Sequence, residues 1–180
     1  MGDQGLVAEF DNGALLVVVD GLGHGEKAAA AASIAIDVCD EYRDEPVEQL
    51  VQRCHTALRG TRGAAMSIAS VNAPANTLTW LGIGNVGAIT VPFTRDERLR
   101  HIHSTPGIVG YNLPALVPSS VDLHTGDLIV FATDGIAPDF PNALRPVGSA
   151  RRIAERILTK HGKDTDDALV LVARYLGGGA

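Results

Sequence analysis

Apolar residues recur along the chain with two different spacings, and the two kinds of segment occur in blocks. Residues 6–10 and 14–20 are strand-like apolar runs on either side of Asp11-Asn12-Gly13. An Asn-Gly pair between such runs is a strong hairpin signal, because both positions tolerate positive φ. The pattern therefore predicts an antiparallel pair of strands at the start of the chain.

Two helices are predicted next, because the apolar spacing changes to the three-to-four interval of an amphipathic helix. These helices cover residues 26–42 and 46–58. Each has one apolar stripe, and a helix of this kind buries its stripe against a sheet.

The remaining chain predicts further strands and one more helix. Residues 65–71, 77–83 and 86–93 have only short polar or glycine breaks between them, which favours an antiparallel meander. A loop rich in Pro and Gly at 105–119 precedes a strand at 128–133, a helix opened by Pro146 and stopped by Gly162, and a last strand at 169–175. The predicted fold is of the α+β class, with two antiparallel sheets and helices packed outside them.

Composition narrows the class of protein. At 180 residues and 46% hydrophobic content, residues 1–180 are expected to form one globular domain. The net charge is −6 and no basic cluster exceeds Arg151-Arg152, so we expect no nucleic-acid partner. No apolar run approaches the roughly 18 residues of a membrane span, so we expect no membrane partner and a cytoplasmic location. Cys39 and Cys54 lack metal-ligand spacing and are predicted to be buried free thiols.

The segment 23–28, GHGEKA, fits the dinucleotide fingerprint G-x-G-x-x-G/A. That fold needs a second parallel strand soon after the helix, yet the sequence RDEPVEQL at 43–50 leads into another helix. Asp20 at the mouth of the glycine loop would also oppose a pyrophosphate. The match is therefore interpreted as accidental.

Four acids lie at strand ends. Asp20 and Asp134 each end a strongly apolar run, Asp166 precedes the last strand, and Asp3 precedes the first one. In a hairpin, Asp3 and Asp20 are neighbours. Turn chemistry explains any one of these acids, but clustered carboxylates stay ionised together only if a cation offsets them. Oxygen ligands suit hard divalent ions such as Mg²⁺ or Mn²⁺.

Two other features are interpreted as ordinary. Asp167 follows Asp166 directly, so an extended chain would project it to the other side. His101 and His103 alternate on one strand-like face but have no third ligand, which is typical of a polar strand face.

A set of short motifs, in this order, resembles the metal-dependent protein phosphatase (PPM) superfamily and, within it, the bacterial SpoIIE-like branch. The motifs are Gly2-Asp3, VVVDGLGHG (17–25), GAAMSIA (63–69), GNVG (84–87), ATDGI (132–136) and DDALVLV (166–172). The resemblance implies an αββα four-layer sandwich. It also implies two divalent metal ions, Mn²⁺ or Mg²⁺, and hydrolysis of phosphoserine and phosphothreonine.

The resemblance assigns metal ligands by motif position. Asp20 would bridge both ions, the Gly21 carbonyl and Asp3 would complete one of them, and Asp134 and Asp166 would hold the other. Catalysis would then depend on Asp20, Asp134 and Asp166 through a water that bridges the metals, whose pKa the two cations lower.

Two positions depart from the pattern of larger relatives. His24 lies two places beyond the position of their proton-donating histidine, so it is either a proton donor or a surface histidine. Asn85 stands where they commonly have aspartate, and it is not counted as a ligand.

Among members of the branch, the small stressosome phosphatases are the most similar. This similarity implies that the substrates are phosphorylated STAS-domain stressosome proteins and that the protein acts as a monomer. The segments 105–119 and 136–146 are expected to set specificity. Two alternatives stay open: a non-catalytic metal-binding or scaffold domain of the same fold, and a SpoIIE-like phosphatase domain cut from a larger signalling protein.

Overall fold

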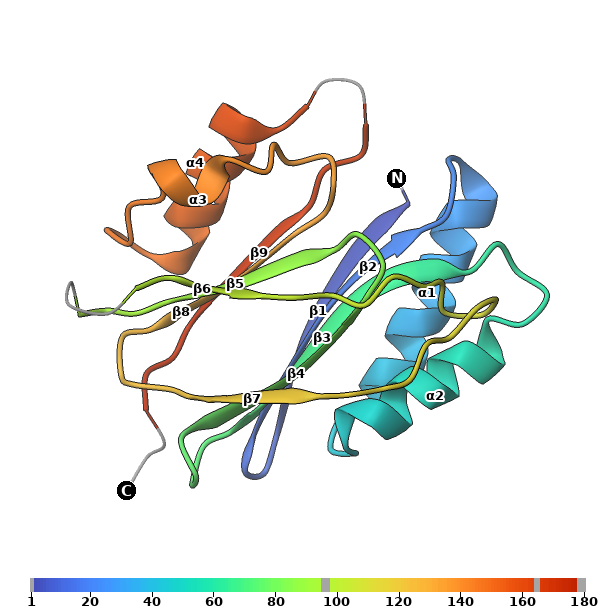
Figure 1. The fold of residues 1–180 in the computed structure, drawn as a ribbon, viewed down its shortest axis with the longest axis horizontal. Coiled ribbons are helices and arrows are strands. Elements are labelled where there is room, and N and C mark those ends of the chain that lie inside the picture. Colours follow the sequence, from blue (N-terminus) through green and yellow to red (C-terminus); the bar gives the residue numbers. More distant parts are fainter. Residues whose placement is uncertain (1, 95–97, 164–165, 178–180) are drawn as a thin grey trace.

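The computed structural model describes residues 2–94, 98–163 and 166–177, in which two antiparallel sheets lie between two pairs of helices (Figure 1). The strands are β1 (Asp3–Phe10), β2 (Gly13–Gly21), β3 (Ala64–Asn72), β4 (Thr77–Ile83), β5 (Gly87–Val91), β6 (Arg100–Ile102), β7 (Ser119–Asp122), β8 (Leu128–Ala132) and β9 (Val170–Arg174). The helices are α1 (Glu26–Glu41), α2 (Val47–Ala57), α3 (Phe140–Ala143) and α4 (Ala150–His161). The predicted αββα sandwich is confirmed.

Each sheet has one face against the other sheet and one face against helices. The first sheet has the order β1-β2-β3-β4-β7, and α1 and α2 cover its outer face (Figure 1). The second has the order β6-β5-β8-β9, and α3 and α4 cover its outer face. Every pairing between these strands is antiparallel, which rules out the parallel unit of a dinucleotide-binding fold.

Three apolar layers hold the four structural layers together. Leu16, Val18, Leu78, Trp80 and Phe131 fill the space between the sheets. The side of α1 that faces the first sheet is made mainly of alanine, so this helix can approach the strands closely. On the opposite side of the molecule, Ile153 and Ile157 of α4 pack onto the second sheet.

The first hairpin forms as predicted, but not for the predicted reason. Phe10 pairs with Gly13, so Asp11 and Asn12 make the turn, and neither Asn12 nor Gly13 has a positive φ. Gly13 is instead required for space, because a Cβ there would overlap the carbonyl oxygen of Val71 on the neighbouring β3.

The predicted three-strand meander is wrong in its last strand. β3 and β4 pair in the first sheet, whereas β5 belongs to the second and pairs with β6 and β8. The chain changes sheets at Gly84, which has φ 89° and lies so close to Ala65 that a Cβ would collide with its side chain. A short glycine break in the sequence thus marks a crossing between layers.

The third long helix begins later than predicted. Pro146 precedes it, but the N-cap is Ser149, whose side chain accepts a hydrogen bond from the backbone N–H of Arg152. The helix ends before Gly162, as expected. The sequence patterns did not predict the short elements β7 and α3, and they indicated β6 (Arg100–Ile102) only as a strand-like face at His101 and His103. In the described part of the chain, no helix has both the length and the apolar character needed to cross a membrane.

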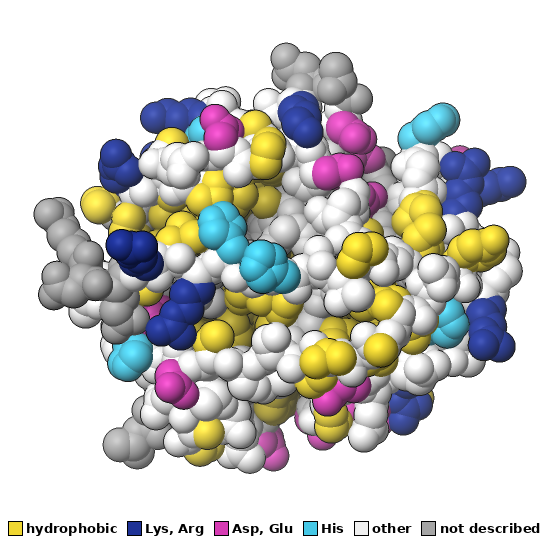
Figure 2. Space-filling view, viewed as in Figure 1, with side chains coloured by type: hydrophobic (Ala, Val, Ile, Leu, Met, Phe, Trp, Pro, Cys, Tyr) yellow, Lys and Arg dark blue, Asp and Glu magenta, His cyan; other side chains and the backbone are white. Residues whose placement is uncertain are grey.

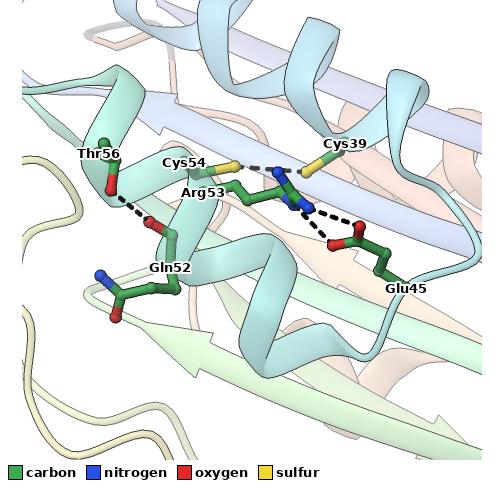
Figure 3. Close-up of polar contacts among 6 residues, drawn as sticks. All are labelled: Cys39, Glu45, Gln52, Arg53, Cys54 and Thr56. Carbon is green, nitrogen blue, oxygen red and sulfur yellow. Dashed lines mark hydrogen bonds and ion pairs between the residues drawn. The ribbon is translucent and has the colours of Figure 1, made fainter.

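The two cysteines are buried free thiols, as predicted. Cys39 on α1 and Cys54 on α2 point toward each other, with their Sγ atoms 3.6 Å apart (Figure 3). On the exposed side of α2, the Arg53 guanidinium donates two hydrogen bonds to the Glu45 carboxylate and lies over the ring of Tyr42. These contacts join the two helices that cover the first sheet.

Candidate metal centre

Strand pairing brings the predicted acids together at one end of the sandwich. Asp3 and Asp20 are register partners in the β1–β2 ladder, as the hairpin geometry predicted. Asp134 follows β8 and Asp166 precedes β9, and these two strands are also antiparallel neighbours. Ends of strands from both sheets therefore meet, and acidic side chains gather along the upper edge of the face in Figure 2.

A buried hydrogen-bond chain joins the two sheets beneath this cluster. The Thr133 hydroxyl donates to Asp3 Oδ2 over 2.7 Å, and its oxygen accepts from the Leu169 N–H over 2.9 Å. Asp3 is only 7% exposed and Thr133 only 2%. This contact fixes the start of β1 against the ends of β8 and β9.

Asn85 links the two acids that end strands of different sheets. Its Nδ2 donates to Asp134 Oδ2 over 2.6 Å and to Asp20 Oδ2 over 3.3 Å. The sequence patterns did not make Asn85 a metal ligand, and they did not predict that its amide holds two carboxylates. The signal was its place in the GNVG motif, between two glycines in the turn from β4 to β5.

Asp167 lies in the cluster, so the prediction that it projects elsewhere is wrong. Its Oδ2 accepts the Gly2 N–H over 2.5 Å, and its charge acts on Asp3. Asp166 and Asp167 lie before β9 begins, so strict strand alternation does not govern their directions. Asp166 Oδ1 instead accepts the N–H of Asp167.

Burial and mutual repulsion make the inner carboxylates weak acids. Burial raises the pKa of Asp20 from 3.8 to about 7, the negative charges of Asp3 and Asp134 add to the rise, and the Asn85 amide opposes it. Burial likewise raises the pKa of Asp3, against the hydrogen bond from Thr133. Removing one negative charge, or adding a cation, would lower the electrostatic repulsion among these carboxylates.

The glycine loop places backbone atoms beside these acids. Gly21 ends β2 and is buried, and a Cβ there would overlap the carbonyl oxygen of Ala28 in the first turn of α1. Gly23 has φ 89°, and a Cβ there would collide with the guanidinium of Arg62. His24 lies exposed in the same loop, outside the hydrogen bonds described for the cluster.

The donors present fit a hard divalent cation. They are carboxylates and backbone carbonyls, the oxygen ligands that Mg²⁺ and Mn²⁺ prefer. Within the described residues, no three His, Cys, Asp or Glu side chains converge on one point. Asp134 and Asp166 are exposed, whereas Asp20 is half-buried. Sites for Mg²⁺ usually combine one or two carboxylates with several waters.

Solved structures share this fold. One chain belongs to a structure described as "The bacterial stressosome: a modular system that has been adapted to control secondary messenger signaling". It is 33% identical, with a TM-score of 0.88 over 96% of this chain and 91% of that one. RsbX in complex with magnesium is 24% identical, with a TM-score of 0.83 over 95% and 85%. The fold and these relatives place the protein among the phosphoprotein phosphatases.

Sequence comparison gives the family. Residues 11–176 match the model of Stage II sporulation protein E (SpoIIE), and the chain belongs to this family. A curated relative is the phosphoserine phosphatase RsbX of Bacillus subtilis (strain 168). It is 27% identical over 184 residues, which cover 96% of this chain and 86% of the relative.

The Thr133 contact makes a stability prediction. Thr133→Val keeps the side-chain volume but leaves Asp3 Oδ2 and the Leu169 N–H without this partner. We expect the free energy of unfolding to fall by about 1–3 kcal/mol, because both groups lie in a buried or part-buried setting. Urea unfolding of the variant and the wild type measures this change in the free energy of unfolding. Thr79→Val is the matched control, because that hydroxyl pairs with Ser120 at the surface. Equal stability of Thr133→Val and the wild type would contradict the structural role.

Proposed function

We propose that the protein removes phosphate from phosphoserine and phosphothreonine of STAS-domain stressosome proteins, with two Mn²⁺ or Mg²⁺ ions at the acid cluster. The observation that carries the proposal is that Asn85 joins Asp20 of the first sheet to Asp134, which follows β8 of the second, while Asp3 lies beside Asp20 in the β1–β2 ladder. The similarity to RsbX and to the chain from the stressosome structure supports the choice of substrate.

The proposed ligand set follows the family pattern. In this set, Asp20 would hold both ions, the Gly21 carbonyl and Asp3 would complete one, and Asp134 and Asp166 would hold the other. When bound, such a pair activates a water for in-line attack and neutralises phosphoryl oxygens. His24, exposed in the glycine loop, is proposed to move a proton to the leaving oxygen.

The surrounding residues would orient this site. Asn85 donates to Asp20 and Asp134 together, so it sets the separation of two proposed ligands. Thr133 keeps Asp3 in place, and Gly2 does the same for Asp167. Positioning of this kind matters, because misplacing a reacting group by 1 Å can cost about a hundredfold in rate.

The protein is further proposed to act as a monomer in the cytoplasm. Two buried thiols that remain free, although their sulfur atoms lie 3.6 Å apart, fit a reducing compartment.

Phosphate release tests the proposal directly. We expect turnover of a phosphorylated STAS-domain protein with Mn²⁺ or Mg²⁺, loss of turnover in EDTA, and recovery when metal is added back. A phosphotyrosine peptide and an unrelated phosphoserine protein, assayed alongside, should react at least about tenfold more slowly, a difference of about 1.4 kcal/mol in transition-state stabilisation. Metal binding without turnover would favour the scaffold alternative. Equal rates on all three would leave a phosphatase and remove the stressosome substrate.

A further inference from the structure

A groove of about 500 Å³ lies on the outer face of the second sheet, between its edge strand β6 and the segment 136–141. One end is formed by Asn85, Thr133 and Asp134, so the groove opens into the acid cluster. Figure 2 shows histidine side chains beside a hollow on this face, with hydrophobic side chains inside it. A ligand in the groove therefore reaches the candidate metal centre.

The polar wall of the groove is basic. His101 is exposed on β6 opposite Ile89, and His103, also exposed, follows two residues later on the same side. Lys163 is exposed at the metal end, where its Nζ donates to the Asp134 carbonyl over 2.6 Å and its N–H donates to the Gly135 carbonyl over 2.8 Å. Among the described residues that line the groove, Asp134 is the one carboxylate. The chain as a whole carries a net charge of −6.

The floor of the groove is apolar. Ile89, Ile136 and Phe140 are 3%, 4% and 8% exposed, and all three contribute to its lining. An apolar floor with a few polar wall groups and a volume of about 300–1,000 Å³ is typical of ligand sites. Such a surface suits a short polypeptide segment, which can contact floor and wall together, better than an isolated phosphate ion.

We propose that this groove binds the substrate segment next to the phosphorylated residue, and that Lys163, His101 and His103 favour segments with acidic side chains. The inference rests on the proposed function, because the phosphorylated residue has to reach the acid cluster. The Lys163 ammonium attracts carboxylates, and each imidazole offers an N–H donor to them. A negatively charged protein repels acidic peptides at long range, so a preference for them requires a local basic site.

Two phosphoserine peptides test this preference. They have the same sequence except that the residues flanking the phosphoserine are glutamate in one and glutamine in the other. We expect the wild-type protein, with Mn²⁺ at fixed pH and low salt, to show a kcat/KM about tenfold higher for the glutamate peptide, mainly through KM. One ammonium contact and two imidazole N–H contacts, each worth a few-fold, together reach this range. The preference should shrink with added salt.

Substitutions test which side chains cause the preference for the glutamate peptide. Lys163→Ala and the double variant His101→Ala/His103→Ala should each reduce the ratio between the two peptides to about threefold or less, and the triple variant should remove it. All three side chains are exposed, so the fold is expected to survive. Lys160→Ala on α4 and His124→Ala after β7 are matched controls outside the groove and should keep the wild-type ratio.

The outcomes separate this inference from the proposed function. Turnover with equal kcat/KM for both peptides, or a preference that the triple variant keeps, would overturn the groove assignment while leaving the phosphatase. Absence of turnover on both peptides would count against the proposed function. In that case, fluorescence anisotropy with fluorescein-labelled peptides still decides on the groove. Tighter binding of the glutamate peptide, lost in the triple variant, supports it, and equal binding overturns it.

Discussion

Asp20→Asn should abolish metal-dependent phosphate release and leave the protein folded. Asp20 is the acid that Asp3 faces in the β1–β2 ladder and that Asn85 joins to Asp134, so it is the shared member of the cluster. An amide keeps the size and one acceptor but loses the charge that a bridging ligand needs. Phosphate release in saturating Mn²⁺ should fall at least about a thousandfold, as for removal of a central catalytic group. Near-wild-type rates in the folded variant would eliminate Asp20 as a metal ligand.

The same substitution should stabilise the metal-free protein at neutral and alkaline pH. The pKa of Asp20 is raised to about 7 in the folded protein from 3.8, so the folded state binds this proton more tightly than the unfolded state does. Stability therefore falls as pH rises from about 4 to about 7, and the full penalty remains above that range. Asparagine carries no such penalty.

Urea unfolding in EDTA measures this effect. We expect Asp20→Asn to exceed the wild type by about 1 kcal/mol at pH 8, after allowance for the partial exposure of Asp20, and the difference to vanish near pH 4. Asp37→Asn, an exposed acid on α1, is the control and should change stability little at either pH. A gain that is the same at pH 4 and pH 8 would show that charge relief is not its cause.

Local sequence signals were sufficient to predict half of the acid cluster. A two-residue turn sets the register of the first hairpin, and that register alone makes Asp3 and Asp20 partners. The apolar runs before Asp134 and after Asp166 likewise predicted strand ends. The strand ends that carry Asp20 and Asp134 belong to different sheets. They meet because the two sheets pack against each other, and no local sequence pattern encodes that packing.

The residues that the sequence patterns missed act across layers. Asn85 reaches both acids because the chain crosses between sheets at Gly84, a crossing that was predicted as one more turn of a meander. Lys163 follows α4 and meets Asp134 because the chain around Gly162 pairs with the segment around Ile136. His101 lies on a strand, as predicted, and His103 follows directly after that strand, but only the position of β6 at the sheet edge places both in a groove.

The two segments expected to set specificity differ in position. Part of the segment 136–146 lines the groove through Ile136 and Phe140. The segment 105–119 is held elsewhere by the pairing of Val109 with Ala64 and by packing of its leucines onto the layer under α1 and α2. Composition rich in Pro and Gly predicted a loop correctly, but it carried no information on which side of the molecule that loop lies.

Asp134→Ala and Asp166→Ala should each weaken Mn²⁺ binding and phosphate release together, by at least about tenfold. The two acids come from segments 32 residues apart, but Ala132 pairs with Val170, so the segments that carry them leave neighbouring strands at the same end of the sheet. If both serve one ion, the first substitution already removes that ion from function. The double variant should then lose little more than the worse single one, because residues that act as a unit are not additive.

Calorimetric titration with Mn²⁺, run beside rate measurements on the same preparations, distinguishes one shared ion from two separate ones. Asp122→Ala is the control, because Asp122 is an exposed acid on β7 of the other sheet and should change neither quantity. Losses that multiply in the double variant would mean that Asp134 and Asp166 serve different sites. Loss of turnover with unchanged Mn²⁺ affinity would mean that they act on the substrate, because a ligand cannot be removed without weakening the binding of its ion.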